Sequence, residues 1–373
     1  PTQTPARCIS QVASTLGIPQ SAVTLNQLRC GAGFGRRLMN EYACEAAAIS
    51  KQVGKPVKLT WTREDDMQND FYRAGGHHAL KGAVDAKGQL SAWQEHFVSF
   101  TPDASKPSLG VLGSVGPKGE ASAAKPVIGG HLRPTVFPGG LVENHLTTQT
   151  LLPWGTPCGA WRAPGSNVFG FVGQSFLHEL SVAAGRDHLE FLLEVLGEPR
   201  WFEEGNSWAL NTGRAAGVVR RAATEAGWGR PLPKGRGLGL AFYFSHAGHF
   251  AEVAEVSVTP AKRLTVHKVT VAGDVGPIVN RSGAENQVEG SVIDGLSSML
   301  AQKITHDRGR AKESNFHLYP LVRMPQIPEV AVHFIESDYP PTGVGEPALP
   351  PLAPAVCNAI YAATGDRIRT LPI

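Results

Sequence analysis

The chain has 373 residues, 42% of them hydrophobic, and a formal net charge of +3. This length accommodates about two or three domains at roughly 150 residues each, while the small charge, without a lysine or arginine run, excludes a nucleic-acid-binding surface. No apolar run approaches the ~20 residues that a membrane-spanning helix needs. Residue 1 is proline and no signal-peptide pattern follows, so we expect a chain that is processed, trimmed or one piece of something larger.

In chain order, the hydrophobic spacing predicts helices over residues 4–17, 40–53, 167–184, 188–196, 212–226, 282–304 and 354–363. It predicts strands over residues 23–27, 57–61, 78–84, 90–100, 238–244, 251–258, 264–271 and 330–334. A Pro-, Gly- and Ser-rich stretch from about 101 to 145 is too long for an ordinary connection and is interpreted as a functional lid or an extended arm. Mixed helices and paired strands indicate an α+β, multidomain fold, which we divide into 1–230 and 231–373.

A glycine loop near the N-terminus joins a predicted strand to a predicted helix. Gly31, Gly33 and Gly35 occupy every second position, which allows backbone N–H groups to approach a ligand closely. Arg36 and Arg37 follow at once. This arrangement is typical of a phosphate cradle, but a tight turn with two surface arginines accounts for it equally well.

Two further segments hold candidate chemistry. Glu346 stands on a loop beside Gly345, just before the last predicted helix and without a cationic neighbour in sequence. Desolvation in an apolar loop raises the pKa of a carboxyl group and suits it to general-base work; the alternative is an ordinary surface glutamate. Arg162 lies between Trp161 and a Pro-Gly turn, where it can grip a phosphate or carbonyl oxygen with two N–H groups or stack on Trp161.

A protein-ligated metal site is not expected. The five cysteines include no Cys-x-x-Cys pair, which excludes an iron–sulfur ligand cluster or a structural zinc site of the usual spacing. The groups His77-His78 and His246-Ala247-Gly248-His249 invite a metal interpretation. On a strand, however, adjacent residues and residues three apart point to opposite faces. We therefore predict free thiols and no metal ligands from this chain.

Taken in order, five motifs carry a resemblance to a known family: Gly31-Ala32-Gly33-Phe34-Gly35-Arg36-Arg37, Trp161-Arg162-Ala163-Pro164, Asp274-Val275-Gly276, Gln287-Val288-Glu289-Gly290 and Gly343-Val344-Gly345-Glu346-Pro347. They resemble the molybdenum hydroxylases, the family of xanthine dehydrogenase and aldehyde oxidase. Within it, the chain is most similar to the C-terminal half of the large (β) subunit of isoquinoline 1-oxidoreductase and of its bacterial aldehyde dehydrogenase relatives. The resemblance implies a molybdopterin-binding region in two portions, of which 231–373 carries Glu346.

The resemblance also implies roles for individual residues. Gln3 matches the glutamine whose amide lies beside the oxo group of molybdenum, and Phe34 with its glycines matches the loop against the metal and the pterin. Arg162 matches an arginine near the cofactor. Glu346 matches the catalytic base, with Gly345 beside it, in the oxidation of an aldehyde or an N-heteroaromatic ring with water as the oxygen source.

The implied cofactor is molybdopterin cytosine dinucleotide with molybdenum, its diphosphate attracted to the glycine loop and to Arg36 or Arg37. Electrons would leave through a separate iron–sulfur subunit, with a cytochrome c as a candidate acceptor, in the periplasm or cytoplasm of a bacterium. Ala32 replaces the more usual middle glycine of the loop. The family's Met-Gly-Gln-Gly-like and Gly-Gly-Ser-Ser segments are missing, so an N-terminal half or a second chain should supply the other wall of the site.

Two rival functions stay open at this point. The first is a nicotinamide-dependent dehydrogenase, with the glycine loop as a Rossmann turn. That fold expects an acidic residue ~20 positions past the loop, whereas the strand-end acids Glu64 and Asp65 come later, which counts against it. The second is a scaffolding subunit without catalysis, which completes the site of a partner.

Overall fold

The computed structural model describes residues 1–101, 108–114, 132–133 and 136–373. Within these ranges the α-helices are α1 (Pro5–Leu16), α2 (Glu41–Val53), α3 (Arg63–Gln68), α4 (Ser166–Ala183), α5 (His188–Leu196), α6 (Thr212–Ala226), α7 (Arg281–Leu300) and α8 (Leu352–Thr364). The strands are β1 (His77–Val84), β2 (Leu90–Thr101), β3 (Ser108–Ser114), β4 (Asn144–Pro153), β5 (Arg236–Ser245), β6 (Gly248–Val258), β7 (Leu264–Asp274), β8 (His306–Asp307), β9 (Arg310–Ala311) and β10 (Glu329–Phe334).

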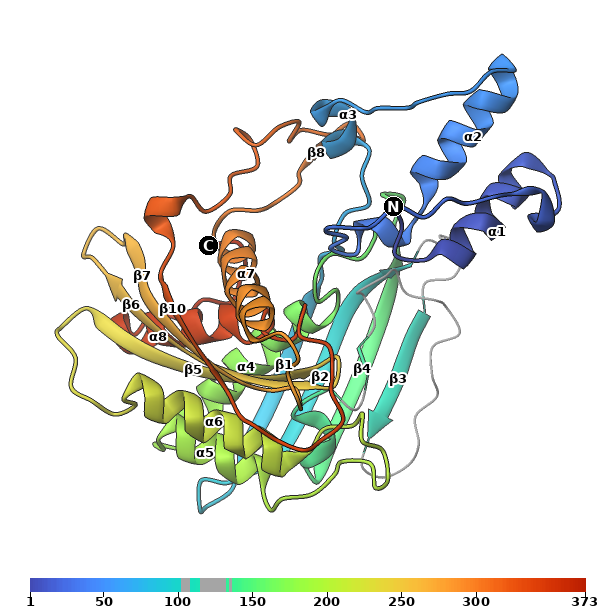
Figure 1. Cartoon of the computed structure of the whole chain (residues 1–373). Helices are drawn as coiled ribbons and strands as arrows, with labels where there is room; N and C mark the ends of the chain where they lie inside the picture. Colours follow the sequence, from blue (N-terminus) through green and yellow to red (C-terminus); the bar gives the residue numbers. More distant parts are fainter. Residues whose placement is uncertain (102–107, 115–131, 134–135) are drawn as a thin grey trace.

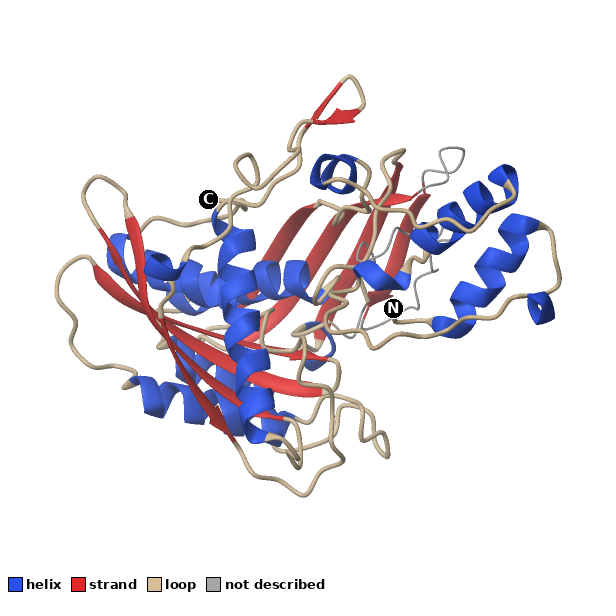
Figure 2. Ribbon diagram, turned by 45° about the horizontal axis from the view of Figure 1, so that its top comes forward, coloured by secondary structure: helices blue, strands red, loops and turns tan. Residues whose placement is uncertain are grey.

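Two four-stranded mixed sheets form the framework (Figure 2). The first has the strand order β1-β2-β4-β3, and its central pair, β2 and β4, is parallel. The second has the order β10-β7-β6-β5, with β10 parallel to β7 and the other pairs antiparallel. The α+β prediction is therefore confirmed, and the antiparallel run of β5, β6 and β7 lies where the sequence places it.

The second sheet is covered on both faces. One face packs against α7 and α8 through an apolar cluster that includes Phe250, Val271, Val292 and Val356. The other face packs against α4, α5 and α6 and reaches β2 of the first sheet, in a cluster that includes Trp93, Leu177, Phe191, Val218 and Phe242. Residues from both sides of position 230 share this second cluster, and the domain boundary there stays a prediction.

Helix α8 approaches β5 unusually closely because two glycines lie beneath it. A Cβ atom at Gly237 would come within 2.3 Å of Ala359 O, and one at Gly239 within 2.1 Å of Ala355 O. A side chain at either position would therefore push the helix off the sheet. This packing holds the start of α8, and with it the loop before it that carries Glu346.

Helices α1 and α2 project from the body of the molecule (Figure 1). Helix α2 has no buried residue, and α1 buries only Cys8 and Ala13. Since most helical stability in proteins comes from packing of an apolar face, these two helices rely on each other more than on the rest of the fold.

Two predicted strands are wrong. Residues 23–27 and 57–61 form no strand in the described chain, because neither segment finds a partner in a sheet. Residues 57–61 instead lead into α3, whose Thr62 and Asp65 form a capping box.

The interpretation of the stretch from 101 to 145 as a functional lid or an extended arm stays a prediction. The stretch contains β3, and most of the remainder lies outside the described residues. Strand β4 was not predicted because its inward positions are polar: His145, Thr147 and Gln149 are buried there together with Leu151.

Candidate active site

The loop after residue 30 and the N-terminus meet through the side chain of Gln3. Its Oε1 accepts a hydrogen bond from Gly35 N at 3.2 Å. A Cβ atom at Gly33 would lie 2.4 Å from Gln3 Cδ, and one at Gly35 would lie 2.5 Å from Ala160 O. Glycine is therefore required at both positions for the loop to lie against Gln3 on one side and residue 160 on the other.

The same loop contacts the Trp161–Pro164 segment. Arg162 N donates to Phe34 O at 3.0 Å, and the Arg162 guanidinium lies 5.8 Å from the centre of the Phe34 ring. Phe34 has a positive φ of 50° and is 49% exposed. The structure thus brings the predicted residues Gln3, Phe34 and Arg162 into one neighbourhood.

The guanidinium of Arg162 is buried and connects this neighbourhood to Glu346. Its Nε donates to Gly345 O at 2.8 Å, its Nη2 to Gln287 O at 2.9 Å and its Nη1 to Asp294 Oδ2 at 2.8 Å. Acceptors within the protein thus bind Nε and both terminal nitrogens of Arg162. The sequence offers a phosphate as one possible partner of this guanidinium, and the structure shows protein groups there instead. A direct contact of Arg162 with cofactor stays a prediction; its visible role is to hold the Gly345 loop.

A second arginine, Arg73, which the sequence reasoning missed, binds the backbone carbonyls of the Trp161–Pro164 segment. Arg73 Nη2 donates to Trp161 O at 2.6 Å and to Arg162 O at 2.7 Å, and its guanidinium lies 4.7 Å from the centre of the Trp161 ring. The cation that stacks on Trp161 is therefore Arg73 and not Arg162. Burial lowers the pKa of Arg73 to about 10, so it remains charged at neutral pH.

This arrangement points one backbone N–H at the candidate base. Ala163 adopts a positive φ of 56°, and its N–H donates to Glu346 Oε1 at 2.9 Å. The other carboxylate oxygen, Oε2, lies 2.9 Å from His246 Nε2. Glu346 is therefore fixed at both oxygens by groups that are remote in sequence.

The pKa of Glu346 is lowered, so the prediction of a raised pKa is wrong, although desolvation acts in the predicted direction. The hydrogen bond from His246 is the largest cause; burial opposes it, and the Ala163 N–H and the charges of His246 and Arg162 lower the pKa further. The sequence could not show this because Glu346 has no cationic neighbour along the chain.

The sequence analysis considered His246 only as a metal ligand and did not anticipate its contact with Glu346. This histidine occupies the first position of the two-residue turn between β5 and β6, where His246 and Ala247 have φ of 52° and 61°, as in a type I′ hairpin. Its Nδ1 lies 2.7 Å from Ser245 Oγ. The nearby His249 is buried and accepts from Asn211 N at 3.0 Å, and burial lowers its pKa to about 3.

No group of three or more His, Cys, Asp or Glu side chains that could hold a metal occurs among the residues that the structure describes.

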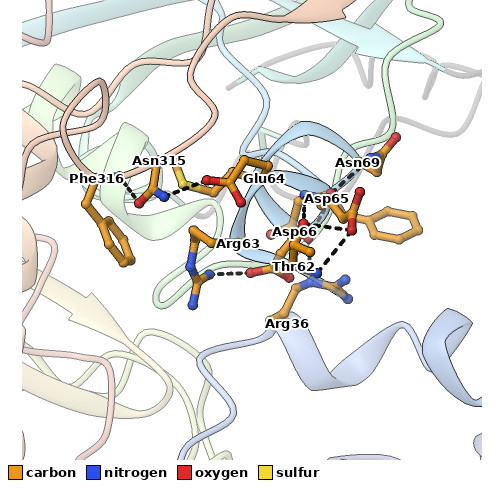
Figure 3. A network of polar contacts seen from close by, with 12 residues as sticks. Arg36, Thr62, Arg63, Glu64, Asp65, Asp66, Asn69, Asn315 and Phe316 are labelled. Atoms are coloured by element: carbon orange, nitrogen blue, oxygen red, sulfur yellow. Dashed lines mark hydrogen bonds and ion pairs between the residues drawn. The ribbon is translucent and has the colours of Figure 1, made fainter. Parts of the chain in front are cut away.

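The arginines after the glycine loop are partly engaged within the protein. Arg36 forms ion pairs with Glu41 and Asp70 and faces the α3 region in the polar network of Figure 3. The guanidinium of Arg37 lies 4.8 Å from the centre of the Tyr42 ring. Since two carboxylates already balance Arg36, Arg37 is the better candidate for a diphosphate, and both roles stay predictions.

Comparisons with known proteins show which kind of domain the chain contains. Residues 1–116 and 200–328 match two family models, each described as a molybdopterin cofactor-binding domain. The chain is 31% identical to the membrane-bound aldehyde dehydrogenase [pyrroloquinoline-quinone] of Gluconacetobacter polyoxogenes, over 97% of this chain and 47% of that protein. It is 30% identical to isoquinoline 1-oxidoreductase subunit beta of Brevundimonas diminuta, over 97% of this chain and 44% of that protein.

The fold is similar to that of quinoline 2-oxidoreductase from Pseudomonas putida 86, with a TM-score of 0.77 at 12% identity, over all of this chain and 70% of the other. Fold and sequence therefore define a molybdopterin cofactor-binding protein of mixed α and β structure. The chain belongs to the molybdenum hydroxylase family. It spans about half the length of the curated relatives it matches, and no helix in the described part is long and apolar enough to cross a membrane.

The residues present fit a bound pterin cofactor. A Cβ atom at Gly31 or Gly343 would meet nothing within 4 Å, and one at Gly345 would meet only Gln287 Oε1 at 3.8 Å, so a ligand can approach the backbone there closely. Phe34 offers an exposed ring in the same loop as Gly31. Gln3, Phe34 and Gly31 would face the cofactor, and Glu346 would face the reacting substrate.

Proposed function

We propose that the chain is the catalytic large-subunit part of a molybdenum hydroxylase that oxidises an aldehyde or an N-heteroaromatic substrate with water as the oxygen source. The observation that carries the proposal is the Glu346 carboxylate, held at Oε1 by Ala163 N and at Oε2 by His246. Its loop is joined through Arg162 to the Phe34 loop. A base held in one orientation beside an open glycine loop is what such an oxidation needs from the protein.

The residues of the chain would divide the work as follows. When bound, the cofactor supplies the two-electron oxidation of the substrate carbon. Glu346, ionised at neutral pH because its pKa is lowered, takes up the proton that the reaction releases. Arg162 and the Ala163 N–H keep the carboxylate in place, so little reorganisation is required as the proton moves.

The cofactor form and the partners belong to the same proposal. Exposed backbone at Gly31 and the guanidinium of Arg37 support a diphosphate, and hence the cytosine dinucleotide form. All five cysteines are free and scattered, which supports iron–sulfur clusters on a separate subunit. A second polypeptide half completes the site, and a cytochrome c is a candidate final acceptor.

The rival functions have less support. A Rossmann turn requires a strand directly before the glycine loop, and residues 23–30 form no strand in the structure as described. The second rival, a scaffolding subunit without catalysis, is tested by measuring turnover: with a pure scaffold, the complex would keep its activity when Glu346 is replaced. The name of one relative includes a quinone, pyrroloquinoline-quinone. Analysis of the purified protein for molybdenum and for quinone distinguishes a molybdenum cofactor from a quinone.

The test is oxygen-isotope tracing on the native complex, purified through a tag on this chain. A panel of aldehydes and N-heteroaromatic rings is incubated in H₂¹⁸O with an artificial electron acceptor. We expect one ¹⁸O atom in each hydroxylated heteroaromatic product. Product that takes its oxygen from O₂, or turnover that requires a nicotinamide cofactor, would overturn the proposal.

A further inference from the structure

The imidazole of His246 contacts the Glu346 carboxylate, and both side chains reach solvent, with Glu346 34% exposed. Its Nε2 is 2.9 Å from Glu346 Oε2 and its Nδ1 is 2.7 Å from Ser245 Oγ, while the side chain is 40% exposed. Ser245 Oγ in turn donates to Ser166 Oγ at 3.0 Å. Both ring nitrogens thus have polar partners, one of them the candidate base.

We propose that His246 accepts the proton that Glu346 takes up and releases it to water, so that the two side chains work as one base. This inference rests on the proposed function of Glu346. The transfer starts from neutral His246, whose Nδ1–H donates to Ser245 Oγ and whose Nε2 is unprotonated. An O–H bond on Glu346 Oε2 breaks as an N–H bond forms on Nε2, which leaves a carboxylate that accepts a hydrogen bond from an imidazolium. The exposed imidazolium then loses one proton to water, and no oxidant or reductant is needed.

The reason for such a partner lies in the charge around Glu346. A general base works best when its pKa lies near the working pH, but the pKa of Glu346 is lowered, chiefly by the hydrogen bond from His246. Arg162 lowers it as well, and Arg73 is a further cation near the carboxylate. Within the pair, the proton therefore resides on His246 rather than on Glu346. Transfer to an imidazole, which ordinarily titrates close to neutral pH, frees the carboxylate for the next turnover.

The backbone supports a role for the ring. His246 and Ala247 both adopt the left-handed conformation, for which a type I′ turn prefers Asn-Gly or Asp-Gly. Asparagine at position 246 would serve the turn, but its shorter side chain would not span the 2.9 Å contact that His246 Nε2 makes. The imidazole of His246 therefore reaches Glu346, which an asparagine or aspartate in this turn would not do.

Two substitutions separate proton acceptance from simple positioning. His246→Gln keeps a side-chain amide that can donate to Glu346 but cannot take up a proton in this pH range. His246→Asn keeps the turn and loses the contact. Ala247→Gly, which changes the neighbouring turn residue with the same left-handed backbone, is the matched control. Turnover per molybdenum is measured for each variant in the native complex. The pKa of Glu346 is measured by infrared titration of its carboxyl band, which is identified as the band that disappears in Glu346→Gln.

We expect both His246 variants to lose at least ~10-fold in turnover, below the range of a whole general base, with molybdenum content unchanged and Ala247→Gly near wild type. The acidic limb of kcat/KM should move to lower pH in His246→Gln, because only the carboxyl group then titrates. The infrared pKa of Glu346 should rise in His246→Asn. Full turnover in His246→Gln, with Glu346→Gln inactive, would overturn this inference alone; full turnover in Glu346→Gln would overturn the proposed function.

Discussion

Glu346 owes its properties to two contacts that cross the chain. One is the N–H of Ala163 and the other is the ring of His246, and together they fix both carboxylate oxygens. Because these hydrogen bonds favour the charged form, the pKa falls despite burial. The carboxylate is thus ionised and oriented before substrate binds.

Glu346→Gln should lower turnover by at least ~10²-fold, the lower end for loss of a general base. The amide keeps the size of the side chain but cannot accept the proton, while molybdenum content and substrate affinity should stay nearly unchanged. Turnover is measured per molybdenum, so that cofactor loss cannot imitate the effect. A rate within a few-fold of wild type would remove Glu346 from the mechanism.

The buried carboxylate of Asp274 stabilises the chain segment that leads to the site. Asp274 and Arg214 are almost fully buried and form two hydrogen bonds of 2.7 and 2.8 Å, and Ser337 Oγ donates to Asp274 at 2.7 Å. Thr342 N, in the same segment, donates to Val275 O at 2.9 Å. Burial opposes the charge of Asp274, but these hydrogen bonds outweigh it and lower its pKa.

Asp274→Asn should therefore destabilise the protein by about 3–5 kcal/mol at neutral pH, since it leaves Arg214 as an unpaired buried charge. A carboxyl whose pKa is lowered on folding stabilises above its unfolded pKa of about 3.9, and this contribution is lost as pH falls through the folded pKa. Urea unfolding at several pH values should show the difference from wild type shrinking below pH ~4. A difference that stays constant on acidification would contradict this account.

At the scale of elements, the sequence predicted the regular parts of the fold well. The helices and the β5–β7 strands follow apolar spacing that survives in the structure, as in α4 and α6. Strand β4 was not predicted because its buried face carries the polar residues Thr147 and Gln149. The strand predicted at 23–27 failed because extended backbone becomes a strand only when a partner pairs with it.

The same contrast applies to the site. The family resemblance located Gln3, Phe34, Arg162 and Glu346 in the sequence, and the structure connects them through hydrogen bonds. It could not assign a role to Arg73, which belongs to no local motif, or to His246, which the sequence offers only as part of a histidine group with a metal interpretation. Their roles depend on a left-handed residue at Ala163 and on a hairpin turn, which only the folded chain brings into place.

The glycine loop and its arginines give a prediction at this scale. Replacing Arg36 and Arg37 together by Ala should lower cofactor occupancy, because a charge-assisted contact to a diphosphate exceeds a neutral hydrogen bond. Arg37→Ala alone should account for most of the loss, since Arg36 is already balanced by Glu41 and Asp70. Cofactor content and thermal unfolding are measured together. Unchanged occupancy with collapsed thermal stability would show that the arginines are structural.

At the scale of the whole molecule, the proposed function has the chain supply one side of a cofactor site. The chain spans about half the length of its relatives, and its glycine loop leaves open space at Gly31 and an exposed ring at Phe34. Helices α1 and α2 project from the body with few buried residues.

We therefore expect the isolated 373-residue chain to retain little or no molybdenum, because a cofactor held on one side only loses much of its contact area. Co-expression with the other half and an iron–sulfur subunit should restore it. Metal content is measured after gel filtration of each preparation. Stoichiometric, tightly held molybdenum on the isolated chain would show that the site is complete without a partner.

The most direct test of the central claim is the molybdenum content of the native complex, isolated through a tag on this chain and analysed by mass spectrometry of metals. The account predicts about one molybdenum per copy of the chain, together with iron from the electron-transfer subunit. A catalytically active complex without molybdenum, and with a quinone in its place, would contradict it.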